Sequence, residues 1–274
     1  MRLKKVRKLA SLTAHSVRTE AARKLVDIGR KDSGEKLVEL YKRWFDIIPA
    51  DTPERLEQSY RLRYQVYCVE TGFEDKAAFP DGLERDGYDE RSVSSLLVHR
   101  PSGSVAGTVR LILPDPSAGD APGLPATRVS ADLRALVPNE LPPTSTAEIS
   151  RFSISKQFRK RREDGLLPAI YENSGQPGDQ RVIPHITLGL MQAILRMSIE
   201  NDITHLCIMV EPALDRLIRR LGIHFTPIGD LVDYHGRRRA HYCENVSLAA
   251  DIYRRRPEIW DVLTDGGALW PKPL

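Results

Sequence analysis

Apolar residues recur at every third or fourth position in several stretches of the chain, a spacing typical of helices that bury one face. The pattern predicts helices over residues 4–30, 35–45, 52–70, 185–201 and 212–222. The third of these has start signals, with Thr52 as N-cap, Pro53 at the first helical position and Glu54 in the first turn. On that helix Arg63 and Tyr67 are four residues apart and would share a face.

Other stretches have the alternating or short continuous apolar runs of β-strands. They cover residues 46–50, 92–100, 105–114, 147–155, 204–211, 225–230 and 238–248. Ser102 and Gly103 lie near the tip of a hairpin formed by two of them. The Pro-rich stretch 114–146 predicts a loop with at most one short helix, and the polar stretch 157–183 predicts a long loop.

This order of elements predicts a mixed α/β sheet in which the strand at 204–211 lies between two helices. The chain has no apparent internal repeat. No G-x-G-x-x-G motif follows a predicted strand, which argues against a dinucleotide-binding fold.

Positive charge is concentrated at the start of the chain. The 274 residues carry a net charge of +4, yet residues 1–50 contain thirteen Lys and Arg against six Asp and Glu. We therefore divide the chain into a basic helical N-terminal arm, residues 1–40, and one domain, residues 41–274. The body is slightly acidic, so we expect no nucleic-acid partner. Shorter basic runs occur at 156–162, 236–239 and 253–256.

The sequence also bears on the compartment. No apolar run is long enough to span a membrane, and the N-terminus lacks the apolar core of a secretion signal, so we expect a cytoplasmic protein. The basic face of the arm adds the hypothesis of a weak peripheral contact with the inner membrane. Cys68, Cys207 and Cys243 lie far apart without metal-site spacing, which favours buried thiols over a disulfide or a zinc site.

The stretch GLERDGYDE, residues 82–90, concentrates four carboxylates on a loop. Such carboxylates repel one another unless cations lie close. Arg63, Arg110 and Arg151 are the candidate cations, and no histidine or second carboxylate cluster accompanies the loop, so we expect arginines and no metal. The alternative is that these residues form unrelated surface ion pairs, each worth little.

The charged residues stand in an order that resembles a known family. RLRYQV with Tyr67, then Phe73, ERDGYD at 84–89, GTVRLILP at 107–114 and EISRF at 148–152 are similar to the signature of acyl-homoserine-lactone (autoinducer) synthases. The wider sequence over about residues 40–247 resembles acyltransferases associated with PEP-CTERM/exosortase systems, relatives of N-acyl amino acid synthases. Both resemblances imply a GCN5-related N-acetyltransferase (GNAT) fold, with a mixed, mostly antiparallel sheet flanked by helices.

The chain departs from the autoinducer synthases at several positions. Tyr67 and Phe73 stand where phenylalanine and tryptophan are usual, the 157–183 insertion is long, and the N-terminal arm is extra. The phosphate loop of coenzyme A-using members, Q/R-x-x-G-x-G/A, is missing after the 147–155 strand. That absence favours acyl carrier protein as the donor of the acyl group.

The resemblance implies roles for individual residues. Glu148, Arg151 and Glu84 would be catalytic, with Glu148 as the base, directly or through a water; the alternative is that Glu148 only orients the ammonium group of the acceptor. The implied substrate-binding residues are Arg63, Tyr67, Phe73, Asp86, Asp89, Arg110, Ser150 and Phe152. Arg159, Lys160, Arg161 and Arg162 would form a basic rim for docking the acidic carrier protein. In a regular strand Glu148 and Arg151 would face opposite sides, so both reach one site only if a β-bulge intervenes.

We therefore expect an amide-forming N-acyltransferase with no permanently bound cofactor. Its donor would be acyl carrier protein carrying a phosphopantetheine thioester, with acyl-CoA as the alternative, and its acceptor the α-amine of an amino acid or similar small amine. One alternative is an autoinducer synthase that uses S-adenosylmethionine. Another is a non-catalytic module that binds acyl carrier protein or lipid.

Overall fold

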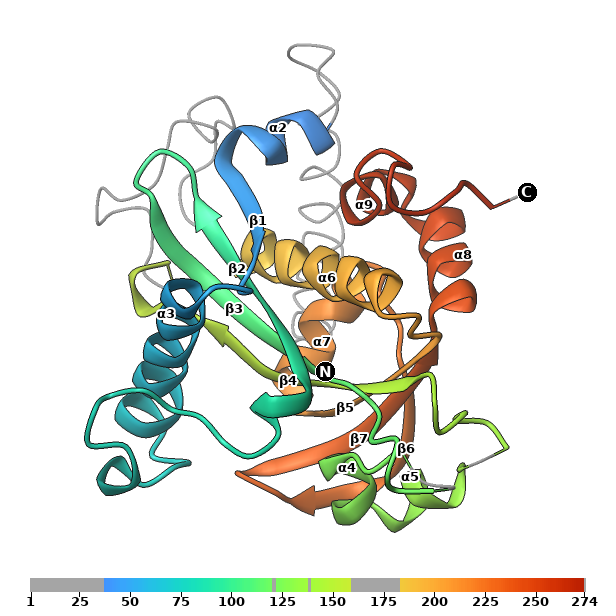
Figure 1. Ribbon diagram of the computed structural model, residues 1–274. Coiled ribbons are helices and arrows are strands. Elements are labelled where there is room, and N and C mark those ends of the chain that lie inside the picture. Colours follow the sequence, from blue (N-terminus) through green and yellow to red (C-terminus); the bar gives the residue numbers. More distant parts are fainter. Residues whose placement is uncertain (1–36, 120–121, 138, 159–182, 274) are drawn as a thin grey trace, which may run out of the picture.

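A seven-stranded sheet runs through the molecule in the order β1-β2-β3-β4-β5-β7-β6 (Figure 1). The computed structural model describes residues 37–119, 122–137, 139–158 and 183–273. The strands are β1 (Phe45–Pro49), β2 (Ser92–His99), β3 (Ser104–Ile112), β4 (Thr146–Ile154), β5 (His205–Val210), β6 (Thr226–Asp233) and β7 (Arg237–Glu244). Every neighbouring pair is antiparallel except β4 and β5, which run parallel. The predicted mixed, mostly antiparallel α/β fold is confirmed.

Helices cover both faces of this sheet. They are α2 (Leu37–Trp44), α3 (Pro53–Tyr64), α4 (Pro125–Val129), α5 (Ala131–Ala135), α6 (Ile183–Glu200), α7 (Pro212–Arg220), α8 (Asn245–Arg255) and α9 (Pro257–Leu263). Helix α6 lies across one face, against β2, β3 and β4, while α3 packs on the other face of the same strands (Figure 1). No helix in the described ranges is both long and apolar enough to cross a bilayer.

The start signals of the third predicted helix are confirmed. Thr52 is the N-cap of α3, and its hydroxyl accepts a hydrogen bond from the Arg55 N–H at 3.4 Å. The helix widens into a π-helical turn over Gln65–Glu70. The division expected between residues 40 and 41 falls inside α2, and residues 1–36 lie outside the described residues, so this division stays a prediction.

Two details of the predicted elements are wrong. The last strand ends at Glu244 rather than 248, because Asn245 anchors its side chain to the Ile203 carbonyl at 2.8 Å and begins α8, which buries Ala249 and Ile252 at helical spacing. The stretch 114–146 contains two short helices rather than at most one. A Ser130 cap separates them, since its hydroxyl accepts from the Leu133 N–H.

A β-bulge interrupts β4, which meets the condition that the sequence analysis set for Glu148 and Arg151 to reach one site. Thr108 pairs with Ser153 and Arg110 with Ser150, so β4 has one residue more than β3 over this interval. Arg151 occupies the bulge with a φ of 50°, in the left-handed region that non-glycine residues seldom adopt. The extra residue reverses the alternation of side chains along the strand.

Strands β4 and β5 pair only at their beginnings. Their register runs from Thr146↔His205 to Ile149↔Ile208, and beyond it no ladder pair joins the two strands in the described ranges. The sheet therefore opens between β4 and β5 next to the bulge.

Two apolar clusters form the core, one on each face of the sheet. The cluster under α6 includes Val109, Leu111, Ile149 and Leu190, and the cluster on the other face includes Ile112, Leu124, Leu133 and Met209. All three cysteines are buried free thiols, as predicted. The face with the second cluster also holds the buried charged residues described below.

Candidate active site

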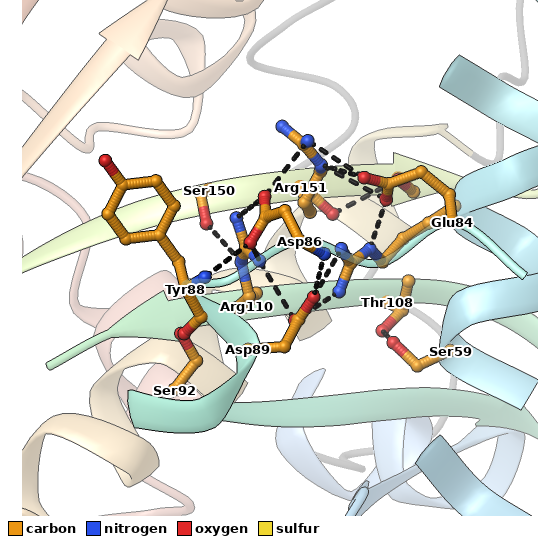
Figure 2. Close-up of polar contacts among 12 residues, drawn as sticks. Ser59, Glu84, Asp86, Tyr88, Asp89, Ser92, Thr108, Arg110, Ser150 and Arg151 are labelled. Atoms are coloured by element: carbon orange, nitrogen blue, oxygen red, sulfur yellow. Dashed lines mark hydrogen bonds and ion pairs between the residues drawn. The ribbon is translucent and has the colours of Figure 1, made fainter. Parts of the chain in front are cut away.

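Three arginines meet the carboxylate loop on the α3 face of the sheet, and Figure 2 labels two of them, Arg110 and Arg151. Arg63 comes from α3, Arg110 from β3 and Arg151 from the bulge of β4. The loop between residue 79 and β2 supplies Glu84, Asp86 and Asp89. The prediction that arginines neutralise this loop is confirmed.

Arg63 joins the two ends of the loop. Its Nε lies 2.5 Å from Glu84 Oε2, and its two Nη atoms lie 2.6 and 3.0 Å from the oxygens of Asp89. The side chains of Arg63 and Glu84 are both fully buried. Charges taken out of water at this depth are tolerated only as well-bonded pairs, so these contacts hold α3 and the loop together.

Arg110 binds the middle of the loop. Its Nη atoms form a fork on the Asp86 carboxylate at 2.6 and 3.0 Å, and Nη1 also lies 2.9 Å from Asp89 Oδ1. Its Nε donates to Ser150 Oγ at 2.9 Å. The planar guanidinium suits this two-point recognition of a carboxylate, which fixes Asp86 above β3 and β4.

Arg151 connects the bulge to three carboxylates. Its Nε and Nη2 donate to Glu84 at 2.9 to 3.2 Å, and Nη2 also lies 3.0 Å from Glu74 Oε1 and 3.2 Å from Asp86 Oδ2. The guanidinium carbon stands 4.8 Å from the centre of the Tyr67 ring. Phe73 lies behind Tyr67, with ring centres 6.4 Å apart. The aromatic pair thus backs the arginine that the bulge presents.

The network keeps its acids ionised. Burial alone would raise the pKa of Asp89, but hydrogen bonds and charge from Arg63, together with Arg110, outweigh it and hold this pKa at about 2. Burial would also raise the pKa of Glu84, but Arg63 and Arg151 outweigh this effect and hold the pKa below its ordinary value. Both oxygens of Glu84 are bound by arginines, so Glu84 holds these cations in place.

A cavity of about 220 Å³ opens beside the network. Its lining residues are Glu74, Phe79, Glu84, Asp86, Tyr88, Arg110, Ile112, Pro125, Glu148, Ser150, Arg151, Tyr234 and His235. The lining residues of the charged network come from β3, β4 and the carboxylate loop, and further lining residues come from Pro125 and the turn between β6 and β7.

Glu148 is a buried carboxyl of the cavity wall with a raised pKa. Its Oε2 accepts the backbone N–H of Ala126 at 2.7 Å, while its Oε1 has no hydrogen bond among the described residues. Burial raises the pKa of Glu148 to about 7, although the Ala126 N–H and the charge of Arg110 act in the opposite direction. A carboxyl with this pKa can take up and release a proton near neutral pH.

The structure brings most of the predicted residues together. Those at the cavity wall or in its network are Arg63, Glu84, Asp86, Asp89, Arg110, Glu148, Ser150 and Arg151, with Tyr67 and Phe73 behind Arg151. Phe152 lies elsewhere: it packs against the core cluster under α6 and does not line the cavity. Arg159, Lys160, Arg161 and Arg162 lie outside the described residues.

Several residues of the cavity wall were missed by the sequence analysis. They are Glu74, Phe79, Tyr88, Ile112, Pro125, Tyr234 and His235. The turn signal of Gly236, which follows Tyr234 and His235 and has a φ of 90°, could have marked the β6–β7 turn but not its approach to β4. Within the described ranges no three His, Cys, Asp or Glu side chains are grouped to hold a metal ion.

Known proteins share parts of this chain and its fold. The acetyltransferase (GNAT) domain family matches residues 62–168. An acyl-homoserine-lactone synthase from Rhizobium radiobacter is 27% identical over 177 residues, which cover 65% of this chain and 72% of that protein. The matched family segment contains the carboxylate loop, the three strands β2 to β4 and the bulge.

Solved structures show the same fold at lower identity. The CoA-dependent acyl-homoserine lactone synthase BjaI, solved with SAM and isopentyl-CoA, superposes with a TM-score of 0.51 at 21% identity, covering 84% of this chain and 90% of that chain. FeeM, an N-acyl amino acid synthase from uncultured soil microbes, superposes with a TM-score of 0.51 at 17% identity, covering 76% of this chain and 94% of that chain. The chain is thus an acyltransferase enzyme with a GNAT fold, homologous to an acyl-homoserine-lactone synthase.

Proposed function

We propose that the protein moves a fatty acyl group from acyl carrier protein to the α-amine of an amino acid or a similar small amine. The observation that carries this proposal is the environment of Glu148. One oxygen of this buried carboxyl is held by the Ala126 N–H, the other has no hydrogen bond among the described residues, and the residue lines a cavity beside a wall of charges. A pKa of about 7 allows Glu148 to accept a proton from an incoming ammonium group.

The reaction needs three things from the site. The acceptor amine must lose a proton, its nitrogen must form a bond to the thioester carbonyl carbon, and the carbon–sulfur bond must break as the thiol leaves. Glu148 would take the proton, directly or through a water. The cavity wall has more carboxylates than arginines, which favours an acceptor that arrives as a cation. If Glu148 only orients the ammonium group, the same residues would still position the acceptor.

The size of the cavity supports a small acceptor. At about 220 Å³ it is below the roughly 300–1,000 Å³ of sites for drug-sized ligands. The cavity therefore suits the acceptor and leaves the acyl chain to lie elsewhere. The divergence of β4 and β5 beyond Ile149 and Ile208 lies next to Arg151 and is where we place the thioester.

The identity of the donor rests on the sequence. The missing phosphate loop after β4 supports acyl carrier protein, and acyl-CoA is the alternative donor. The basic run at 159–162 belongs to this proposal as the docking rim for the acidic carrier. No permanently bound cofactor is required. The association with PEP-CTERM/exosortase systems and the weak membrane contact of the arm stay predictions.

A second candidate is an autoinducer synthase that uses S-adenosylmethionine as acceptor. The observation that favours it is the 27% identity to the Rhizobium radiobacter acyl-homoserine-lactone synthase. In this reaction the same amide bond forms first, and a lactone ring closes afterwards. Tyr67 and Phe73 stand where that family usually has phenylalanine and tryptophan, which is why we place it second.

One experiment separates these functions. The purified full-length protein is incubated with acyl carrier protein or coenzyme A loaded with the same fatty acid, and with either a mixture of amino acids or S-adenosylmethionine. Mass spectrometry should detect an N-acyl amino acid that depends on the carrier-bound donor and forms much more slowly with Glu148→Gln. An acyl-homoserine lactone would support the second candidate. No amide product from any combination would contradict both and favour a non-catalytic binding module.

A further inference from the structure

One arginine near the site is paired differently from the others. Arg238 on β7 belongs to the basic run at 236–239, and its side chain is only 15% exposed. Its one ionic contact in the described ranges runs from Nη2 to Glu211 Oε1 at 3.5 Å, the limit of a hydrogen bond. Its Nε is buried without a hydrogen-bond partner. Arg63, Arg110 and Arg151, by contrast, each make several bonds of 3.2 Å or less to carboxylates.

Burial with so few bonds is unfavourable for a guanidinium. A donor that is removed from water and left without a partner destabilises the protein, and the penalty is larger when the group is charged. Glu211 compensates little, because its own side chain is 47% exposed and water screens the pair. Arg238 is therefore a largely buried cation without a close carboxylate among the described residues, and an anion that reached its Nη atoms would supply the missing countercharge.

The position of Arg238 connects it to the candidate active site. It lies two residues before Ala240, which belongs to the core cluster on the same face of the sheet as the cavity. Its guanidinium carbon is 5.5 Å from the centre of the Phe73 ring, and that ring is 5.8 Å from the imidazole of His235, which lines the cavity. Tyr234, also on the cavity wall, lies within the electrostatic reach of both Glu148 and Arg238.

The position of Glu211, the carboxylate partner of Arg238, helps to locate Arg238 in the sheet. Glu211 follows directly after β5, past the last ladder pair between β4 and β5. Arg238 therefore lies beside the end of β5, on β7 and thus on the side of β5 away from β4, and it is close to the cavity without lining it. A group that projects from an acceptor in the cavity, or from a thioester between the strands, would pass this guanidinium.

We propose that Arg238 is an anion-binding residue at the mouth of the active site, which receives a carboxylate or phosphate group of a substrate. Its fork of donors matches both groups in a two-point geometry, and the Phe73 ring restrains the guanidinium plane before the anion arrives. The anion has two sources, the carboxylate of an amino acid acceptor or the phosphate of a phosphopantetheine donor. This inference rests on the proposed acyl transfer, since that reaction brings such groups to the site.

The test measures binding and does not need turnover. Isothermal titration of the full-length protein compares 4′-phosphopantetheine with pantetheine, and N-decanoylglycine with N-decanoylglycinamide, so that each pair differs in the anion alone. Wild type should bind the anionic member of one pair at least about tenfold more tightly, and that pair identifies the source. Arg238→Met should remove the preference, and Arg238→Lys should retain part of it, because lysine keeps the charge without the fork.

Arg237→Met is the matched control, because Arg237 is the exposed neighbour on the same strand. It should keep the preference of the wild type. Equal binding of both members in both pairs by wild type, or an unchanged preference in Arg238→Met with a normal melting curve, would overturn the anion site. A preference that depends on Arg238 in a protein that forms no amide product would instead leave the anion site standing and contradict the proposed function.

Discussion

Glu148 and Arg151 stand three residues apart on β4, and both side chains line the same cavity. Side chains of a regular strand alternate between faces, so this spacing would separate them. The bulge adds one residue to β4 against β3, and the left-handed φ of Arg151 turns its side chain back to the side of Glu148. A local departure from strand geometry thus brings Glu148 to the same side of the sheet as the charged network.

The backbone at Arg151 predicts an unusual order of stabilities. At a φ of 50° a Cβ is unfavourable by about 1–2 kcal/mol, so Arg151→Gly should be more stable than Arg151→Ala by about that amount in denaturant unfolding. The control is Arg239, a residue of β7 without a positive φ. There Arg239→Ala should be more stable than Arg239→Gly, because glycine weakens the interior of a strand. Equal stability of the two Arg151 variants would mean that the bulge is not strained.

The raised pKa of Glu148 predicts the pH dependence of the reaction. The base must be unprotonated, so kcat/KM should rise with pH along a limb centred near 7. Glu148→Gln should lower kcat about 10²–10⁴-fold and remove this limb. Glu90→Gln changes an exposed carboxylate of the loop and is the control that should keep the wild-type profile. A limb near 7 that persists in Glu148→Gln would assign it to another group.

The same carboxyl should affect stability with a defined sign. Folded Glu148 holds its proton up to a pH of about 7, whereas the unfolded side chain releases it near 4.5, so its contribution is full below 4.5 and is lost as pH rises through 7. The free energy of unfolding of wild type relative to Glu148→Gln should therefore fall between pH 5 and 7.5. Urea denaturation of both proteins at several pH values measures this difference. If the free energies of unfolding of wild type and Glu148→Gln change with pH in parallel, the pKa of Glu148 is not raised.

Asp89 should be a strong contributor to stability. Asp89→Asn leaves Arg63 buried with a weakened partner, and breaking a buried pair costs about 3–5 kcal/mol. The control is Asp81→Asn, because Asp81 pairs with Arg85 at 2.8 Å but both side chains are more than 40% exposed, and such pairs contribute about 0–1 kcal/mol. The contribution of Asp89 is present above its ordinary pKa and is lost as pH falls toward 2. Similar losses in both variants would argue against burial as the cause.

Double-mutant cycles should show which residues of the charged network interact directly. Asp89 contacts Arg63 directly. Arg151 is connected to Asp89 through Glu84, which both Arg151 and Arg63 bind. The Asp89–Arg63 cycle should give a coupling energy of about 0.5–3 kcal/mol in thermal or denaturant unfolding. The Asp89–Arg151 cycle should give a smaller one. A larger value for the second pair would mean that the two residues touch.

The order of most elements and the pairing of the loop carboxylates with arginines can be predicted from the sequence alone. Apolar periodicity is a local property, so the start of α3 at Thr52 and the strands β2 to β5 could be predicted from neighbouring residues alone. Loop carboxylates that repel one another need cations, which is enough to connect residues 84–89 to arginines. The bulge followed from the parity of positions 148 and 151, given that both belong to one site.

Which groups face one another depends on the packing of elements that are far apart in the sequence. Ala126 is 22 residues from Glu148, and it is the packing of α4 on the sheet that delivers its N–H to that carboxyl. The position of β7 beside β5 brings Tyr234 and His235 to the cavity, and the bulge sends Phe152 to the opposite face. These contacts depend on sheet order and on the burial that it creates. Burial raises the pKa of Glu148 to about 7, because removing water disfavours its charge and no arginine of the described residues forms an ion pair with it. Arg63, by contrast, holds the pKa of Asp89 at about 2.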